Sequence, residues 1–348
     1  MSSLRIALAL SLTLISGCGG GSDVVPTTNY SSIYGLTLDN AATPTKLVIA
    51  NPANQTIQTL TLSNNAVAVM AGAANVAGTV DGTGTGAKFN GPYGITLSGT
   101  DYYVADLNNH AIRKLTNAGV VSTLAGSAGS SGAADGTGAA ARFNTPTGLV
   151  SDGTNLFVTD TSNQLIRKVV ISTGATTTLA GGVGASGITD ATGTSARFNA
   201  PFGIAFDNTS LFVTDTGNHT IRKVTTGGVV TTFAGTAGTS GTTDATGTAA
   251  KFNTPSGIVS DGTHLFVADS GNHTIRKVVI ATGVVSTLAG TAGTSGSSDG
   301  TGAAARFDVP FGLTIDNAGN LYVSDQNYTK IRKIVTSTGA VSTISASF

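Results

Sequence analysis

The nine residues DSGNHTIRK, Asp269 to Lys277, reveal the fold because they recur along the chain at a nearly constant spacing. The isoleucine that precedes Arg-Lys returns at intervals of 54, 55, 54 and 56 residues. A second landmark is a phenylalanine that follows lysine or arginine, and it returns at intervals of 54, 55, 54 and 55. Two independent landmarks with one period indicate a structural repeat of about 55 residues. The landmark residues are Ile112, Ile166, Ile221, Ile275 and Ile331, and Phe89, Phe143, Phe198, Phe252 and Phe307.

A sixth, degenerate copy precedes these five. Asn51, Asn54, Gln55 and Ile57 align with Asp106, Asn109, His110 and Ile112 at a spacing of 55. Tyr30 stands five residues before Gly35, where the phenylalanine is expected, and Gln58-Thr59 replaces Arg-Lys. Terminal copies of repeat proteins are often atypical. The sequence therefore predicts six copies.

Each copy has the pattern of four short strands. In one copy a strand begins at Gly203, a second carries the apolar triplet Leu211 to Val213, and a third is Ile221 to Val224. A tight turn at Gly227-Gly228 leads to the fourth strand, Val229 to Phe233. A continuous apolar triplet is typical of a strand covered on both faces, and we expect the third strand to alternate apolar and charged residues. Four-stranded sheets repeated around an axis form a β-propeller.

The fold class is therefore all-β, a six-bladed β-propeller of four-stranded antiparallel blades. The structural rival is a solenoid, which the tight turns disfavour because parallel coils need long crossovers. No strand is left over to complete the ring. Blade six is expected to meet blade one through side-chain packing, unless Val24 to Thr28 pairs as an extra edge strand.

The turns before the third strands resemble the NHL repeat. The resemblance rests on DLNNHAI at 106–112, DTGNHTI at 215–221 and DSGNHTI at 269–275, and it covers roughly residues 30 to 348. Two copies depart from it, one with Asn163-Gln164-Leu165 and one with Tyr328-Thr329-Lys330. The resemblance implies the propeller fold but not one function. NHL propellers include protein-binding and RNA-binding modules, receptor sensor domains and metal-dependent amidating lyases.

The N-terminus predicts export. The apolar run Ile6 to Ile15 is shorter than the ~20 residues that a membrane span needs, and its length is that of a signal-peptide core. It ends in Ile15-Ser16-Gly17-Cys18, which resembles a bacterial lipobox, and Cys18 is the only cysteine. We therefore expect a signal peptide at 1–17, lipidation of Cys18, a flexible tether at 18–29 and the propeller at 30–348. The predicted location is the bacterial outer membrane, with an ordinary signal peptide as the alternative.

Composition excludes several functions. The formal net charge is zero, with 18 basic residues against 18 aspartates and no glutamate. A neutral chain without a basic excess gives no electrostatic attraction for nucleic acid. The absence of glutamate leaves only aspartate pairs for glycosidase chemistry. It also removes a calcium ligand that gluconolactonase-like propellers use. The sole cysteine is assigned to the lipid and no serine has the strand-to-helix setting of a nucleophile elbow, so we expect no catalytic residue.

The aspartate and Asn-His residues of the second-to-third turns have a structural explanation. Asp and Asn side chains bond the backbone of turns, which accounts for their recurrence without a ligand. Equivalent turns lie around the circumference of a ring, whereas zinc needs nitrogens about 2.0 Å away, and His264 is expected at the other end of its blade. We therefore predict no metal site and no cofactor. The recurring turn pairs are Asn109-His110, Asn218-His219 and Asn272-His273.

The long connection into each blade carries the remaining candidate site. An aspartate precedes a lysine or arginine by seven residues, and the segment between them is expected to form one helical turn capped by threonine. The aspartate and cation are expected to pair or to cap the loop, and the following phenylalanine to fill the space between blades. Alternatively, the cations form a ring around the channel mouth that suits an anionic ligand. These cations are Lys88, Arg142, Arg197, Lys251 and Arg306, and with the Asn-His pairs they form the candidate ligand-binding face.

These observations favour a lipid-anchored, non-enzymatic binding or scaffold module for a protein or glycan. The propeller is expected to be monomeric, to contact the membrane through its lipid only and to bind no nucleic acid. The alternative is a metal-dependent lyase or hydrolase at the channel mouth, with calcium or zinc as its cofactor. A structural protein of the cell envelope is a third class.

Overall fold

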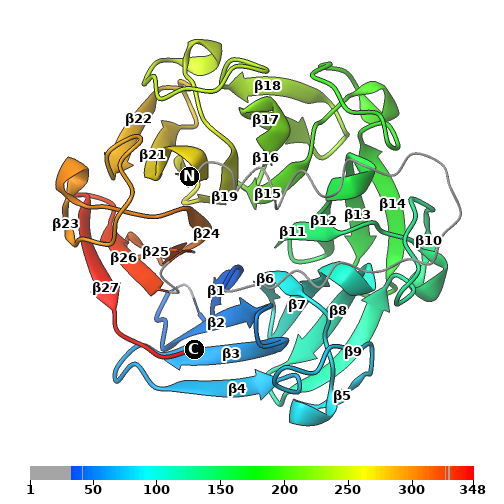
Figure 1. The fold of residues 1–348 in the computed structure, drawn as a ribbon. Coiled ribbons are helices and arrows are strands. Elements are labelled where there is room, and N and C mark those ends of the chain that lie inside the picture. The colour runs from blue at the N-terminus through cyan, green and yellow to red at the C-terminus, as the bar shows by residue number, and fades with distance from the viewer. Residues whose placement is uncertain (1–32, 41, 326, 328–329) are drawn as a thin grey trace, which may run out of the picture.

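The computed structural model describes residues 33–40, 42–325, 327 and 330–348. The described chain forms six antiparallel sheets arranged around one axis, as Figure 1 shows. The six-bladed β-propeller predicted from the repeats is therefore confirmed. Residues 1–32, which hold the expected signal peptide, Cys18, the tether, Val24 to Thr28 and Tyr30, lie outside the described residues.

Each blade runs from an innermost strand to an outer one in chain order. Blade one is β1 (Leu36–Leu38), β2 (Lys46–Asn51), β3 (Thr56–Thr61) and β4 (Val67–Ala71). Blade two is β6 (Pro92–Ser98), β7 (Asp101–Asp106), β8 (Ala111–Thr116) and β9 (Val120–Ala125). Blade three is β11 (Pro146–Ser151), β12 (Asn155–Asp160), β13 (Leu165–Val170) and β14 (Ala175–Ala180).

The second half of the ring repeats this order. Blade four is β15 (Pro201–Phe206), β16 (Ser210–Asp215), β17 (Thr220–Thr225) and β18 (Val230–Ala234). Blade five is β19 (Pro255–Ser260), β20 (His264–Asp269), β21 (Thr274–Val279) and β22 (Val285–Ala289). Blade six is β24 (Pro310–Ile315), β25 (Asn320–Asp325), β26 (Lys330–Val335) and β27 (Ala340–Ile344).

The connections between blades contain short strands that the sequence did not predict. Three of them add a short fifth strand, β5 (Gly82–Thr83), β10 (Gly136–Thr137) and β23 (Gly300–Thr301), to the outer edge of the blade they enter. Single bridges from Thr192 to Val229 and from Thr246 to Val284 do the same in blades four and five. The predicted four-stranded blades are therefore present, and the connections also shield part of an edge whose backbone groups would otherwise be unpaired.

The expected helical turn before each phenylalanine is present as a single 3₁₀ turn. These turns are η1 (Gly84–Gly86), η3 (Gly138–Ala140), η5 (Gly193–Ser195), η7 (Gly247–Ala249) and η9 (Gly302–Ala304). The expected capping by threonine is wrong, because no threonine side chain bonds the turn it precedes. A three-residue turn leaves fewer free N–H groups than an α-helix, and here the backbone of the neighbouring turn bonds the first of them, as Gly119 O accepts from Gly84 N.

The hydrophobic core lies between the blades rather than within them. Phe89 is fully buried among Ile57 and Ala71 of blade one and Tyr102 and Val104 of blade two. The same arrangement surrounds the other four landmark phenylalanines, so their predicted place between neighbouring blades is confirmed. Because each sheet is covered on both faces, no blade has a core of its own and the ring must form as a unit.

Among the described residues, the first and last blades meet through side-chain packing and a hydrogen bond from Ser324 Oγ to Tyr34 O at 3.0 Å. Each sheet comes from one contiguous stretch of the described chain. Ile33, Leu36 and Leu47 of the first copy pack against Tyr322 and Ile331 of blade six. No strand of the described residues crosses between the first and last blades. Among the helices of the described chain, none combines the length and apolar character that crossing a membrane requires.

Candidate binding face and axial cavity

The second-to-third turns and the long connections meet on one face. Asn109, in the turn η2 (Leu107–Asn109), donates from Nδ2 to Gly78 O of the incoming connection at 2.7 Å. Asp106 accepts from Asn90 N of the same connection at 2.8 Å. Equivalent bonds recur at Asn163, Asn218 and Asn272. The structure therefore brings the predicted loop and turn residues together, and the asparagines bind the connection as well as their own turns.

A buried arginine holds each connection against its blade. Arg222, with 1% of its side chain exposed, places Nη1 2.8 Å from Asp215 Oδ2 and Nη2 2.6 Å from Asp190 Oδ1. It also donates to Arg197 O and Thr189 O, and its guanidinium carbon lies 5.2 Å from the centre of the Phe198 ring. Five blades contain this arginine clamp, through Arg113, Arg167, Arg222, Arg276 and Arg332.

The arginine clamp determines the partner of the outer aspartate and the burial of the third strand. Asp190 pairs with Arg222 and not with Arg197, the cation seven residues after it. In β17 the charged residue Arg222 is fully buried and the next one, Lys223, is partly exposed. The physical reason is that the connection covers the face of the sheet on which Arg222 lies. The expected pair between the aspartate and the cation seven residues later is therefore wrong, whereas the alternative holds for the cation, because Arg197 donates to Thr194 O and Ala196 O of its own loop.

Burial dominates the electrostatics of the inner aspartate. It raises the pKa of Asp215 to about 6, while the N–H of Asn199, the charge of Arg222 and the amide of Asn218 oppose that rise. Asp106, Asp160, Asp269 and Asp325 share this environment, and their pKa values also rise to about 6. An unpaired charge at such a site is very unfavourable, so the carboxylate and the guanidinium depend on one another.

Blade one replaces the whole pair by neutral groups. Asn51 stands where the other blades have the inner aspartate, and Gln58 where they have the arginine. Asn51 Nδ2 donates to Gln58 Oε1 at 3.0 Å, and both side chains are buried. The joint exchange keeps a hydrogen bond and removes both charges, which explains the loss of Arg-Lys in this copy.

The histidines join adjacent blades. His219 Nδ1 accepts from the backbone N–H of Thr254 in the next connection at 3.0 Å. His110 and His273 accept in the same way from Thr145 and Val309, and the acceptors at the two other described joints are Gln55 and Gln164. A ring nitrogen and an amide oxygen are both acceptors. The repeat therefore requires an acceptor at this position rather than a histidine.

Protonation should weaken these joints. Burial lowers the pKa of His110, His219 and His273 below 6.5, and at His273 the carboxylate of Asp308, 3.4 Å away, partly opposes this. The neutral imidazole is the form that accepts the backbone hydrogen bond. The unfolded chain binds more protons below pH 6.5, so the stabilisation is present above that pH and is lost as the pH falls.

The His110→Gln, His219→Gln and His273→Gln triple variant should therefore lose less stability in acid than the parent chain. Urea unfolding at pH 5 to 8 gives the difference in free energy of unfolding between the two. We expect a constant difference above pH 7 that changes in favour of the variant below about pH 6.5. Among the single variants, His273→Gln should show the smallest change in the pH dependence of stability, because Asp308 partly offsets the lowering of the His273 pKa. A difference that is independent of pH would contradict this role.

The loop cations are held by their own connections. Arg142 Nη1 donates to Ala139 O and Ala141 O at 2.5 and 2.7 Å, and Arg197 and Arg306 make the equivalent bonds. Lys88 and Lys251 form no ion pair with the described residues, and their aliphatic stems lie along the connections. All five cations are partly exposed.

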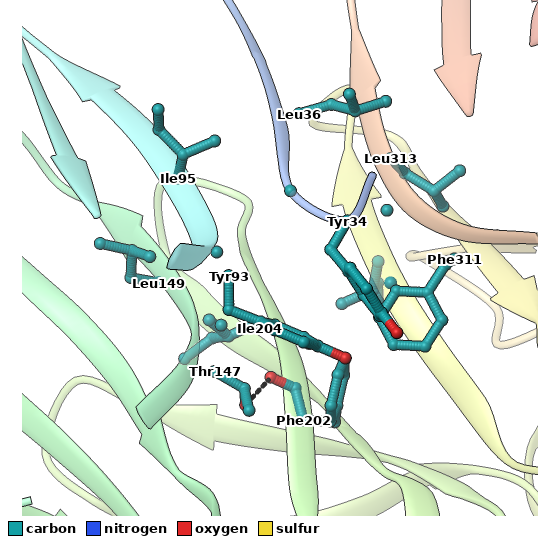
Figure 2. A pocket seen from close by; sticks show the side chains of 17 residues that line it. Tyr34, Leu36, Tyr93, Ile95, Thr147, Leu149, Phe202, Ile204, Phe311 and Leu313 are labelled. Atoms are coloured by element: carbon teal, nitrogen blue, oxygen red, sulfur yellow. Dashed lines mark hydrogen bonds between the residues drawn. The ribbon is translucent and has the colours of Figure 1, made fainter. Parts of the chain in front are cut away.

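An apolar cavity lies on the propeller axis, where the innermost strands meet. Its volume is about 100 Å³, and Figure 2 shows the aromatic side chains that converge on it. Four rings contact one another in this cluster: Tyr34 lies 4.4 Å from Tyr93 and 4.8 Å from Phe311, and Phe202 lies 5.1 Å from Phe311 between centroids. Blades three and five place Thr147 and Ser256 at the same repeat position.

This axial cluster was not predicted from the sequence. The signal was the recurring Pro-x-Gly at the start of the inner strands, in which x is Tyr93, Thr147, Phe202, Ser256 or Phe311. The glycine is constant because a Cβ on Gly203 would lie 2.3 Å from Ser256 O of the next blade. The neighbouring side chain varies because it faces the cavity.

Side chains that could bind a metal ion do not cluster in the described part of the chain. No group of three His, Cys, Asp or Glu side chains converges there. His264 begins β20, at the opposite end of that strand from the turn that holds His273, and its Nδ1 lies 3.1 Å from Asp261 Oδ2.

Comparisons with known proteins agree with this architecture. Residues 252–278 match the NHL repeat model. The chain is 30% identical over 281 residues to NHL repeat-containing protein 2 of Gallus gallus, an alignment that covers 71% of this chain and 38% of that protein. It therefore spans less than half the length of that relative.

Solved structures share the fold at low sequence identity. An auxiliary nutrient binding protein from Bacteroides thetaiotaomicron superposes with a TM-score of 0.65 and 16% identity, over 90% of this chain and 70% of that one. Virginiamycin B lyase from Staphylococcus aureus superposes with a TM-score of 0.55 and 15% identity, over 92% and 87%. The matched repeat, the NHL repeat-containing relative and the six-bladed ring together identify this chain as an NHL-repeat β-propeller protein.

Proposed function

We propose that this propeller is a non-enzymatic binding module, exported and anchored through a lipid on Cys18, that takes a protein or glycan ligand on the face of the connections. The observation that supports this proposal is that most charged groups on that face are bound to partners within the propeller, whereas the loop cations are partly exposed. The arginine clamps and histidine joints hold the blades together, and the outer aspartates are bound to arginine and threonine, as Asp190 is to Arg222 and Thr232. The partly exposed loop cations remain for a ligand.

The ligand chemistry follows from these cations. Lys88 and Lys251 are without an ion pair among the described residues, and the partly exposed arginines of the other connections, Arg142, Arg197 and Arg306, bond backbone carbonyls of their own loops. Such groups favour an anionic ligand, whether an acidic protein surface or a charged glycan. A metal-dependent lyase is not favoured, because the described residues include no cluster of three metal ligands.

Reversing the two lysines should weaken binding to an anionic glycan. The purified chain is applied to a dextran sulfate column, with neutral dextran as the reference matrix, and eluted with salt. We expect the Lys88→Asp, Lys251→Asp variant to elute at lower salt than the parent, because like charge repels the matrix. The matched control is Lys168→Asp with Lys277→Asp, on β13 and β21, which changes the formal charge by the same amount. If the control variant elutes at the same low salt concentration as the Lys88→Asp, Lys251→Asp variant, only the net charge of the chain determines binding.

The membrane anchor has a direct chemical test. The proposed acyl acceptor is the thiol of Cys18, which lies in the lipobox-like sequence. Radiolabelled palmitate should enter the chain in a bacterial host, and the Cys18→Ser variant should take up no label and leave the membrane fraction. Persistent label in that variant would contradict lipidation at this residue.

A further inference from the structure

The axial cavity has the features of a binding site for one small, uncharged ring. All seventeen residues that line it are uncharged. Six aliphatic side chains form its wall, one from each blade: Leu36, Ile95, Leu149, Ile204, Ile258 and Leu313. Each is only 5–9% exposed. A charged guest would lose its hydration there without an opposite charge on the lining to compensate.

The aromatic cluster is incomplete around the axis. Blades one, two, four and six contribute Tyr34, Tyr93, Phe202 and Phe311 to the lining, whereas blade three contributes the smaller Thr147. In blade five the small residue Ser256 holds the same repeat position beside the lining residue Gly257. The rings meet mainly edge to face, with Tyr34 to Phe311 at 87° and Phe202 to Phe311 at 88°. Aromatic rings prefer this geometry, and a guest ring beside the two small residues would extend it.

The hydroxyls of the two small residues are bonded to the protein wall. Thr147 Oγ1 lies 2.6 Å from Thr161 Oγ1 and donates to Phe202 O at 3.1 Å. Ser256 Oγ lies 2.5 Å from Ser270 Oγ and 3.3 Å from Phe311 O. These two hydroxyls therefore offer little to a sugar ring, whose hydroxyl groups need partners, and the other side-chain hydroxyls of the lining are those of Tyr34 and Tyr93.

We infer that the axial cavity binds an uncharged aromatic ring of benzene to phenol size, carried by a small molecule or by the end of a larger ligand. The volume of about 100 Å³ is of the order of an apolar cavity of ~150 Å³ that stays dry and binds benzene. None of the loop cations lines this cavity, and the inference does not depend on the anionic ligand proposed above.

The inference is tested with phenol and, as the polar ring, methyl α-glucoside. Saturation-transfer NMR on the purified full chain should show transfer to phenol and none to the glucoside, and titration should give a millimolar dissociation constant. The variant Ser256→Phe fills one of the two gaps with the residue type that blades four and six use. It should weaken phenol binding at least tenfold. Ser122→Phe, on the exposed outer strand β9, is the matched control and should bind as the parent does.

Three results would overturn the inference. They are the absence of transfer to phenol, equal transfer to the glucoside, and unchanged phenol affinity in a folded Ser256→Phe variant. Circular dichroism establishes whether that variant is folded. If it is not, Thr147→Phe fills the other gap and decides the outcome by the same tenfold criterion.

Discussion

Replacing Arg222 by glutamine should lower the free energy of unfolding by about 3–5 kcal/mol. The guanidinium is fully buried and bridges Asp215 and Asp190 while it bonds two carbonyls of the incoming connection. Its removal leaves the buried carboxylate of Asp215 without its counter-charge. Urea unfolding monitored by circular dichroism measures the loss. The adjacent Lys223→Gln variant should cost less than about 1 kcal/mol, because Lys223 is partly exposed.

Blade one supplies the stronger test of this coupling. The double variant Asp215→Asn with Arg222→Gln copies the neutral Asn51–Gln58 pair, so it should be markedly more stable than the Arg222→Gln single variant. The physical reason is that both buried charges leave together, and a neutral hydrogen bond takes their place. If the double variant loses as much as the two single variants combined, the groups are not coupled in this way.

Substituting alanine for Gly203 should lower the free energy of unfolding by about 3 kcal/mol, at the upper end of the range for overpacking. A Cβ at this position would lie 2.3 Å from the carbonyl oxygen of Ser256, a backbone atom of the next blade. Backbone cannot move aside as a side chain can, so the innermost strands β15 and β19 must separate. The midpoint of urea unfolding reports the change.

The control for this substitution is Gly86→Ala at the end of η1. No atom lies within 4 Å of a Cβ built on Gly86, so this variant should keep the stability of the parent. An equivalent close backbone contact between neighbouring blades joins Gly312 to Tyr34, because a Cβ on Gly312 would lie 2.0 Å from Tyr34 O. Gly312→Ala should therefore be as damaging as Gly203→Ala, since it acts where the last blade meets the first. If all three alanine variants are equally stable, close backbone packing does not explain the two inner glycines.

The number of blades, their strand order and the place of the landmark phenylalanines could all be predicted from the amino-acid sequence. Those features depend on periodicity and on short turns, both of which are local along the chain. The role of Arg222 was not visible in this way. Its partner Asp190 lies 32 residues away, and an Arg-Lys pair in a strand predicts an exposed face unless another segment covers it.

Only the folded ring shows which recurring residues face solvent, which face the axis and which contact a neighbouring blade. His219 and Gln164 are unlike in sequence but equivalent in space, because each accepts an N–H of the next blade. Tyr93 and Phe311 stand 218 positions apart, yet their rings lie 5.9 Å from one another at the axis. A repeat specifies its own strands through local pattern, whereas contacts between repeats exist only once the ring has closed.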